Sequence, residues 1–351
     1  MTTAASSSSS SSVVTTDLPL KLLAKGKVRD VYDAGIPEGE EHAGAILFVA
    51  TDRISAFDVV LDNGIPEKGP LLHALSTFWF SLLTPSILPS HILSTSFSTF
   101  PESLQARLDV HRDQLDGRSM LVRRAKVLPI EAIVRGYITG SGWKEYQKSG
   151  TVHGLKIAEG LKESEKIPGG PIFTPSTKAD QGSHDENIHP DKAADLLGPA
   201  LAKAVSEAAL NLYRTASEHA ASRGIILADT KFEFGLVSSS QSGLPPTASL
   251  AGSSLPSGES LDDMTLILVD EVLTPDSSRF WSAEDFQPGR GQASWDKQYV
   301  RDWLKANGKD GAADTGEVVR LPDEVVQKTR EKYQEAYERI TGQKWKGVTG
   351  V

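Results

Sequence analysis

Two short acidic segments, each preceded by an apolar run, constrain the fold of this chain most. Residues 225–228 and 265–269 are aliphatic and β-branched, a composition that predicts two buried strands. Residues 238–260 between them are mostly Ser, Gly, Pro, Ala and Leu, which indicates a loose insertion in a hairpin loop. The two strands should therefore lie side by side and bring five charged side chains together: Asp229, Lys231, Glu233, Asp270 and Glu271.

Side-chain alternation along the first strand places Asp229, Lys231 and Glu233 on one face. Carboxylates that share a face repel one another unless a cation lies between them. A divalent metal is the usual cation, and a metal among carboxylates most often holds the phosphates of a nucleotide. A solvated strand face is the alternative, but two neighbouring acidic strands make it the less favoured interpretation. The pattern predicts a metal-dependent nucleotide site.

Composition limits the classes of protein that fit. The chain has 351 residues, of which 39% are hydrophobic and 24% charged, as expected for a soluble globular protein with two domains or two lobes. A net charge of −9 argues against a general nucleic-acid binder, and no apolar run is long enough to span a membrane. Cysteine is absent, which suits a reducing compartment. Residues 1–17, rich in Ser and Thr, lack the features of a signal peptide or presequence and are expected to be a disordered tail.

Three basic segments are candidates for binding anions. Residues 25–32 place a Gly between cations at the start of a strand, and residues 120–129 run from an apolar strand into a basic segment that could be a hinge between lobes. Residues 131–142 end an apolar strand in Arg135 and a Gly-rich turn, as in a phosphate cradle at a helix N-terminus. Each has an ordinary alternative, a surface turn or a flexible Gly loop. Apolar spacing also predicts helices over 70–83, 191–223 and 322–340.

Seven short strings follow one another along the chain, and they begin at Gly26, Thr51, Val134, Phe173, His184, Asp229 and Asp270. Taken together, these motifs resemble one family, the SAICAR synthetases. The resemblance covers roughly residues 18–341, its motifs occur in the right order, and those at 173–178 and 184–187 look like the fungal branch. The Ser-rich tail and the 238–260 insertion are departures, but neither includes a motif.

The resemblance implies an ATP-dependent ligase of purine biosynthesis. It would join L-aspartate to the carboxylate of carboxyaminoimidazole ribotide through an acyl phosphate and give SAICAR, ADP and phosphate. It also implies an α+β fold with two lobes: an antiparallel, kinase-like nucleotide lobe over 18–124 and an α/β lobe over 125–351 that carries the substrates and metal. ATP would lie in the cleft between them. The implied cofactors are ATP and Mg²⁺, in a cytoplasmic enzyme that is expected to be monomeric.

The resemblance also suggests roles for individual residues. Glu233, Asp270 and Asp229 would hold Mg²⁺, and Lys231 would act with Glu233 and Asp270 in catalysis. ATP would contact the phosphate loop and the hinge, represented by Gly26, Lys27, Arg29, Leu121, Arg123 and Ala125. The ribotide and aspartate would be bound by Ser55, Arg135, Ser141, Lys178, Asp185, Asp276 and Arg279.

Two other functional classes are compatible with some of these motifs. A small-molecule kinase could use the same metal strands and would release ADP without aspartate. A binding protein without activity could keep the nucleotide cleft, although the retained acidic pair argues against it. Turnover measured with and without aspartate distinguishes the three.

Overall fold

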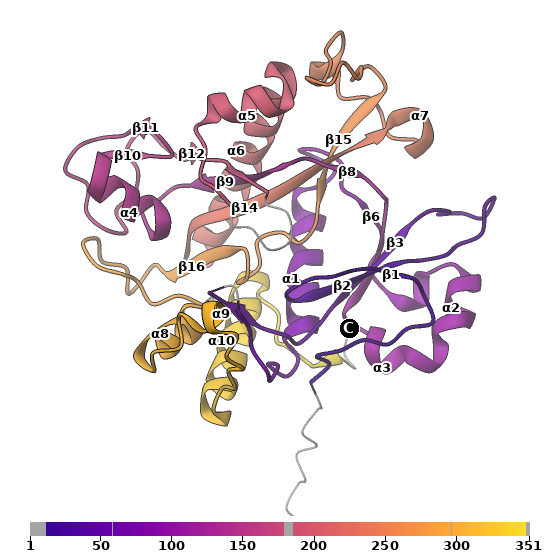
Figure 1. Ribbon diagram of the computed structural model, residues 1–351, viewed down its shortest axis with the longest axis horizontal. Coiled ribbons are helices and arrows are strands. Elements are labelled where there is room, and N and C mark those ends of the chain that lie inside the picture. Colours follow the sequence, from indigo (N-terminus) through magenta and orange to yellow (C-terminus); the bar gives the residue numbers. More distant parts are fainter. Residues whose placement is uncertain (1–11, 58, 179–184, 296, 349–351) are drawn as a thin grey trace, which may run out of the picture.

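The N-terminal lobe is built on an antiparallel sheet in the computed structural model, which describes residues 12–57, 59–178, 185–295 and 297–348 (Figure 1). The strand order is β1-β2-β3-β7-β6. Alternate residues of β2 and β3 are buried, as expected for strands with one face on a core. The strands are β1 (Leu22–Lys25), β2 (Arg29–Asp33), β3 (Ile46–Ala50), β6 (Ile92–Ser94) and β7 (Ser119–Val122).

The second lobe has a seven-stranded sheet around one long strand, β14 (Ile225–Ser238). β14 pairs antiparallel with four strands, and its second half runs beside β15 with Glu233 opposite Val269. The two strands expected from the acidic segments are therefore neighbours. The other strands of this sheet are β8 (Lys126–Val127), β9 (Ile130–Arg135), β12 (Ile172–Phe173), β13 (Ser176–Thr177), β15 (Met264–Val269) and β16 (Ser278–Ser282).

Helices cover the sheets, and two short hairpins, β4 (Ser55–Ala56) with β5 (Val59–Val60) and β10 (Thr151–Val152) with β11 (Leu155–Lys156), lie outside them. None of the helices in the described part of the chain is both long and apolar enough to cross a membrane. The helices are α1 (Lys68–Leu83), η1 (Phe97–Thr99), α2 (Glu102–Leu108), η2 (Asp109–His111), α3 (Arg112–Leu115), α4 (Gly140–Ser149), α5 (Pro190–Leu197), α6 (Pro199–Ser222), α7 (Ser239–Ser242), η3 (Ala248–Leu250), α8 (Gln298–Ala306), α9 (Ala312–Thr315) and α10 (Asp323–Thr341).

Helix α1 contacts both lobes. Trp79, Phe80 and Leu83 belong to the large core that α6, β9 and β14 also form. The start of α1 lies against the backbone of β3 so closely that a Cβ on Gly69 would be 2.4 Å from the carbonyl oxygen of Ala50. In Figure 1, α1 accordingly lies between the two sheets. This helix therefore joins the lobes and does not serve the N-terminal one alone.

The expected helices are present, with one difference. Residues 191–223 form two helices because the chain breaks at Gly198, whose φ of 82° is followed by a Pro at the first position of α6. Helix α10 has the expected start and stop. Pro322 precedes it, two acidic residues occupy its first turn, and Gly342 ends it in the left-handed region.

Residues 238–260 do not form the loose loop that their composition indicates. The segment contains α7 and η3, and the side chain of Leu250 is fully buried in the core of the second lobe. At its other end, the carboxylate of Glu259 forms an ion pair with Lys126. Leu250, on η3, and Leu255 pack this segment against the core to which α6 also belongs.

The described end of the expected N-terminal tail is not disordered. Residues 1–11 lie outside the described part of the chain, but residues 13–17 are bonded to the first lobe. The backbone N–H of Val13 donates to Asp52 at 2.7 Å, and the Thr16 hydroxyl donates to Asp30 at 2.6 Å. The buried carboxylates of the lobe thus anchor a segment that composition alone assigns to disorder.

Candidate active site

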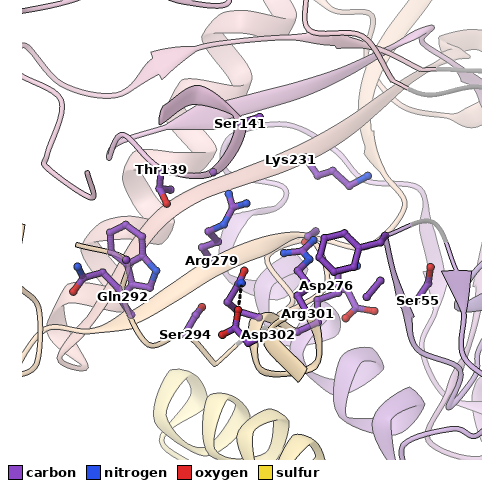
Figure 2. Close-up of a pocket in the computed structure, with 18 of the residues that line it drawn as sticks. Ser55, Thr139, Ser141, Lys231, Asp276, Arg279, Gln292, Ser294, Arg301 and Asp302 are labelled. Atoms are coloured by element: carbon purple, nitrogen blue, oxygen red, sulfur yellow. Dashed lines mark hydrogen bonds between the residues drawn. The ribbon is translucent and has the colours of Figure 1, made fainter. Parts of the chain in front are cut away.

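A cavity of ≈ 1160 Å³ collects side chains from both lobes (Figure 2). The N-terminal lobe contributes the loop before β2 and the β4–β5 hairpin, and the second lobe contributes β14, β16, α4 and α8. The structure brings most of the expected site residues together here. Those that line the cavity are Lys27, Arg29, Ser55, Ser141, Lys178, Lys231, Glu233, Asp270, Asp276 and Arg279.

One corner of the cavity is suited to a phosphate. Helix α4 begins there, and the residue that precedes it, Thr139, makes no side-chain cap, so the first backbone N–H groups of α4 are available to an anion. Ser141 and Arg279 line the same corner. Gly140 makes this possible, because its φ is +58° and a Cβ there would lie 2.6 Å from the Arg279 guanidinium.

Asp229 supports this corner and does not lie with the other two expected metal ligands, Glu233 and Asp270. Its carboxylate pairs with Arg279 and, at 2.8 Å, with Arg135, whose guanidinium also donates to the Ser141 hydroxyl at 3.2 Å. Arg135 itself is 3% exposed and stands behind the cavity wall. Asp229 and Glu233 are four residues apart on an extended strand, so their Cα atoms are about 13 Å apart. One ion cannot contact both carboxylates, so the expected role of Asp229 as a metal ligand does not fit this geometry.

Glu233 and Asp270 form the acidic pair on neighbouring strands. Burial and the nearby Asp270 charge raise the pKa of Glu233. Burial would also raise the pKa of Asp270, but Arg29 and Lys178 outweigh it and hold that pKa below its usual value. The backbone of Asp270 has a φ of 65°, an uncommon conformation for a residue other than Gly, where the chain turns out of β15 toward the cavity.

Cations already neutralise this pair in part. Lys178 forms an ion pair with Glu233, and Arg29 pairs with Asp270 at 2.8 Å and with Glu271 at 3.6 Å. Arg29 was expected to meet ATP phosphates directly, but here its guanidinium holds two carboxylates. A role in positioning Asp270 is the one that its contacts support.

The acidic pair fits Mg²⁺ held together with a nucleotide. Within the described residues, no three His, Cys, Asp or Glu side chains are grouped as a metal site. Mg²⁺ is commonly bound by one or two carboxylates, with substrate phosphates and water completing its octahedron. Two carboxylates on neighbouring strands, both lining a cavity large enough for a nucleotide, meet that requirement.

Lys231 lies between the two halves of the site and stays charged. It forms an ion pair with Glu131 on β9. Burial alone would lower its pKa, but Glu131 and Glu233 raise it above the usual value. The side chain is therefore a fixed positive charge beside the acidic pair, suited to an oxyanion and not to proton transfer.

Some expected residues lie elsewhere. Leu121 is fully buried in the core of the first lobe, Arg123 donates to the carbonyl of Ser242 at 3.1 Å, and Ala125 packs on the strands β14 and β15. Gly26 closes the turn before β2, its N–H bonded to the Arg29 carbonyl at 2.7 Å. Asp185 is exposed. None of these five lines the described cavity, so contact of the hinge with adenine stays a prediction.

Sequence reasoning missed one whole wall of the cavity. Lys297, Arg301 and Lys305 line it from the start and one face of α8, and the side chain of Gln298 donates to Asp302 at 2.8 Å (Figure 2). The signal was available, because cations spaced four residues apart fall on one face of a helix. Further lining residues that were missed are Thr139, Glu163, Trp281, Gln292 and Ser294, whereas Glu271 lines the cavity beside Asp270 as the acidic segments predict.

Comparison with known proteins agrees with the geometry. The family model of SAICAR synthetase matches residues 22–244 and 258–317. The chain is 50% identical to the phosphoribosylaminoimidazole-succinocarboxamide synthase of Cyberlindnera jadinii over 328 residues, 93% of this chain and 96% of that one. Identity to the synthase of Schizosaccharomyces pombe is 49% over 331 residues, with 94% and 97% covered.

Solved structures are also similar. The SAICAR synthase of Saccharomyces cerevisiae complexed with SAICAR superposes with a TM-score of 0.78 at 46% identity, covering 95% of this chain and all 100% of that one. A SAICAR synthetase in complex with ADP has the same fold, with a TM-score of 0.58 at 24% identity and with 92% and 99% covered.

Proposed function

The chain belongs to the SAICAR synthetase family, and we propose that the cavity between its lobes holds all three substrates of the family's reaction. That reaction uses ATP to join L-aspartate to carboxyaminoimidazole ribotide in purine biosynthesis and yields SAICAR, ADP and phosphate. The observation that carries the proposal is the arrangement of two unlike anion sites in one cavity. The corner at α4 suits a phosphate monoester, and the acidic pair suits a metal-bound nucleotide.

The chemistry explains why a single cavity must hold everything. A carboxylate is too poor an electrophile for an amine to attack. The ribotide carboxylate therefore first attacks the γ-phosphorus of ATP, and ADP leaves. The amine nitrogen of aspartate then attacks the acyl carbon. The bond between that carbon and the phosphate oxygen breaks, phosphate leaves with the electron pair, and the nitrogen gives up one proton. The attacking groups belong to the substrates, so the protein has to align them and stabilise charge.

Each residue then has a role that its contacts support. Glu233 and Asp270 would hold Mg²⁺, which would supply positive charge to neutralise the ATP phosphates. Arg29 keeps Asp270 in place, and Lys27 and Lys231 face the transferred phosphoryl group. Arg279 and Ser141 grip the ribotide phosphate, with Arg135 behind them.

The remaining side chains complete the substrate sites. We assign Lys297 and Arg301 to the two carboxylates of L-aspartate, because these cations lie on a wall distinct from the phosphate corner. Ser55, Lys178 and Asp276 line the space between and contact the ribotide or aspartate. Asp185 is exposed, and its proposed contact with the ribotide or aspartate stays a prediction. The contact of the hinge at Leu121, Arg123 and Ala125 with adenine also stays a prediction.

We also propose that the enzyme acts as a monomer in the cytoplasm. Both lobes of the chain contribute residues to the described cavity. Light scattering coupled to gel filtration measures the molar mass in solution. A dimer at assay concentration would contradict the proposed monomer.

ADP release measured with each substrate omitted in turn tests the function. Release should require ATP, Mg²⁺, the ribotide and aspartate together, with SAICAR formed in equal amount. The same rate of ADP release without aspartate would support a small-molecule kinase. Nucleotide binding without any turnover would support the binding protein.

A further inference from the structure

A carboxylate at the cavity wall is held by two buried donors that no substrate role explains. Asp276 lines the cavity, but its side chain is only 5% exposed. Lys68, at the start of α1, donates to one carboxylate oxygen, Oδ2, at 2.7 Å. The hydroxyl of Tyr333, on α10, donates to the other, Oδ1, at 2.5 Å. The fold therefore fixes both oxygens and the plane of the group.

Burying the charged donor Lys68 costs free energy. The Lys68 side chain is completely buried, and its ammonium lies 5.6 Å from the centre of the Tyr333 ring. A buried ion pair is seldom more stable than apolar residues of the same volume, so stability alone does not account for this arrangement. An ordered carboxylate facing a substrate cavity does account for it.

Tyr333 comes from a helix that the match to the family model does not reach. That match ends at residue 317, whereas α10 covers Asp323–Thr341. This helix is fixed to the start of α1, because Glu67 forms an ion pair with Arg330 and accepts a hydrogen bond from the indole of Trp345 at 3.3 Å. Lys68 follows Glu67 directly, so one junction positions both donors.

We infer that Tyr333, together with Lys68, is a positioning residue for Asp276, through which α10 takes part in the ligase reaction. A carboxylate oxygen has two acceptor sites, and the fold occupies one on each oxygen of Asp276. The free sites accept a hydrogen bond from a substrate N–H or O–H group in the cavity. This inference rests on the proposed function, because that function places in the cavity a substrate that Asp276 can orient.

The conservative change Tyr333→Phe removes one hydroxyl and keeps the ring. Because a hydrogen bond to a charged group is lost, kcat/KM for the ribotide or for aspartate should fall about tenfold or more, while KM for ATP stays within about twofold. Tyr337→Phe is the matched control, one turn further along α10. Its hydroxyl donates only a long bond of 3.4 Å to Gln343 near the surface, and its rates should equal those of the wild type.

A double-mutant cycle separates positioning from general support of the fold. In an Asp276→Asn background, Tyr333→Phe should change kcat/KM by less than about twofold, because its target is already altered. Thermal unfolding of each variant checks that it is folded. Equal rates for the Tyr333 and Tyr337 variants would overturn the inference, as would the same tenfold loss in the Asn background. A wild-type protein without ligase turnover would instead overturn the proposed function.

Discussion

At the residue scale, three carboxylates of the site differ in how exposed their cationic partners are. Asp229 is matched by Arg135 and Asp276 by Lys68, and both cations are buried. Glu233 is matched by Lys178, which is 37% exposed. A lysine at the surface can move away at little cost, so Glu233 is the carboxylate most easily released to a metal.

Removing the charge of the acidic pair tests the metal site. Glu233→Gln and Asp270→Asn should each lower kcat by several orders of magnitude, because the metal contributes several kcal/mol of transition-state stabilisation. The double variant should be little worse than either single one. Rates measured against Mg²⁺ concentration should show partial rescue of the single variants.

The control is Glu335→Gln, which removes a carboxylate that pairs with Arg339 on the surface of α10. It should leave kcat and its dependence on Mg²⁺ unchanged. If either variant of the acidic pair also turned over at the wild-type rate, that residue would not be a metal ligand.

Arg135 offers a second test at this scale. Its guanidinium reaches Asp229 and Ser141 at once, which a lysine cannot do. Arg135→Lys should therefore raise KM for the ribotide about tenfold or more and change KM for ATP less than about twofold. Steady-state kinetics with each substrate varied measures both. Equal increases for the two substrates would assign Arg135 to the fold as a whole.

At the element scale, the segment 238–260 illustrates what composition hides. Its Ser, Gly and Pro content is typical of a loose loop, yet Leu250 is fully buried and Leu261, just after it, is 1% exposed. The leucines follow neither a helical nor a strand period, so no pattern in the sequence reveals which of them reach the core. The family match has a gap at 245–257, within this segment.

Leu250→Ala should therefore destabilise the protein by about 2–5 kcal/mol, as expected for a large buried aliphatic side chain. Turnover per folded molecule should stay close to that of the wild type, because the residue does not line the cavity. Leu196→Ala, at a side chain that is 39% exposed, is the control and should change stability by about 0.5 kcal/mol or less. Denaturant unfolding measures both. Equal stability of the two variants would restore the loose-loop interpretation.

Features with a local signature in the sequence could be predicted, whereas features that depend on which strands pair could not. The acidic strands and the phosphate corner were predictable because charge, alternation and Gly placement leave a local signature around Glu233 and Ser141. The pairing of Asp229 with two arginines was not, since it depends on where β9 and β16 pair with β14. The wall formed by α8 was missed although its cations have helical spacing, because no neighbouring motif drew attention to it.

At the scale of the whole molecule, the lobes share one helix. α1 packs its apolar side chains into the core of the second lobe, and its first residues lie against the first lobe. α10 packs along α1 and is tied to Glu67. Neither lobe can lose its structure without exposing apolar surface of the other.

The two lobes should consequently unfold together. Scanning calorimetry should give one transition, with a calorimetric enthalpy close to the van't Hoff enthalpy. Adding ATP with Mg²⁺ should raise the midpoint of that transition without splitting it, since a ligand that binds only the native state stabilises the whole cooperative unit. Two separate transitions would show that the shared helix does not couple the lobes.

The tie between Glu67 and residues 330 and 345 also bears on the order in which the enzyme is made. A ribosome adds residues from the N-terminus, so the β-strands of the first lobe emerge long before Arg330 and Trp345 exist. The pairing of Lys68 is completed only when Asp276, and after it Tyr333, have emerged, and its ammonium stays in solvent until then. The fixed carboxylate of Asp276 is therefore assembled only after α10 has been made.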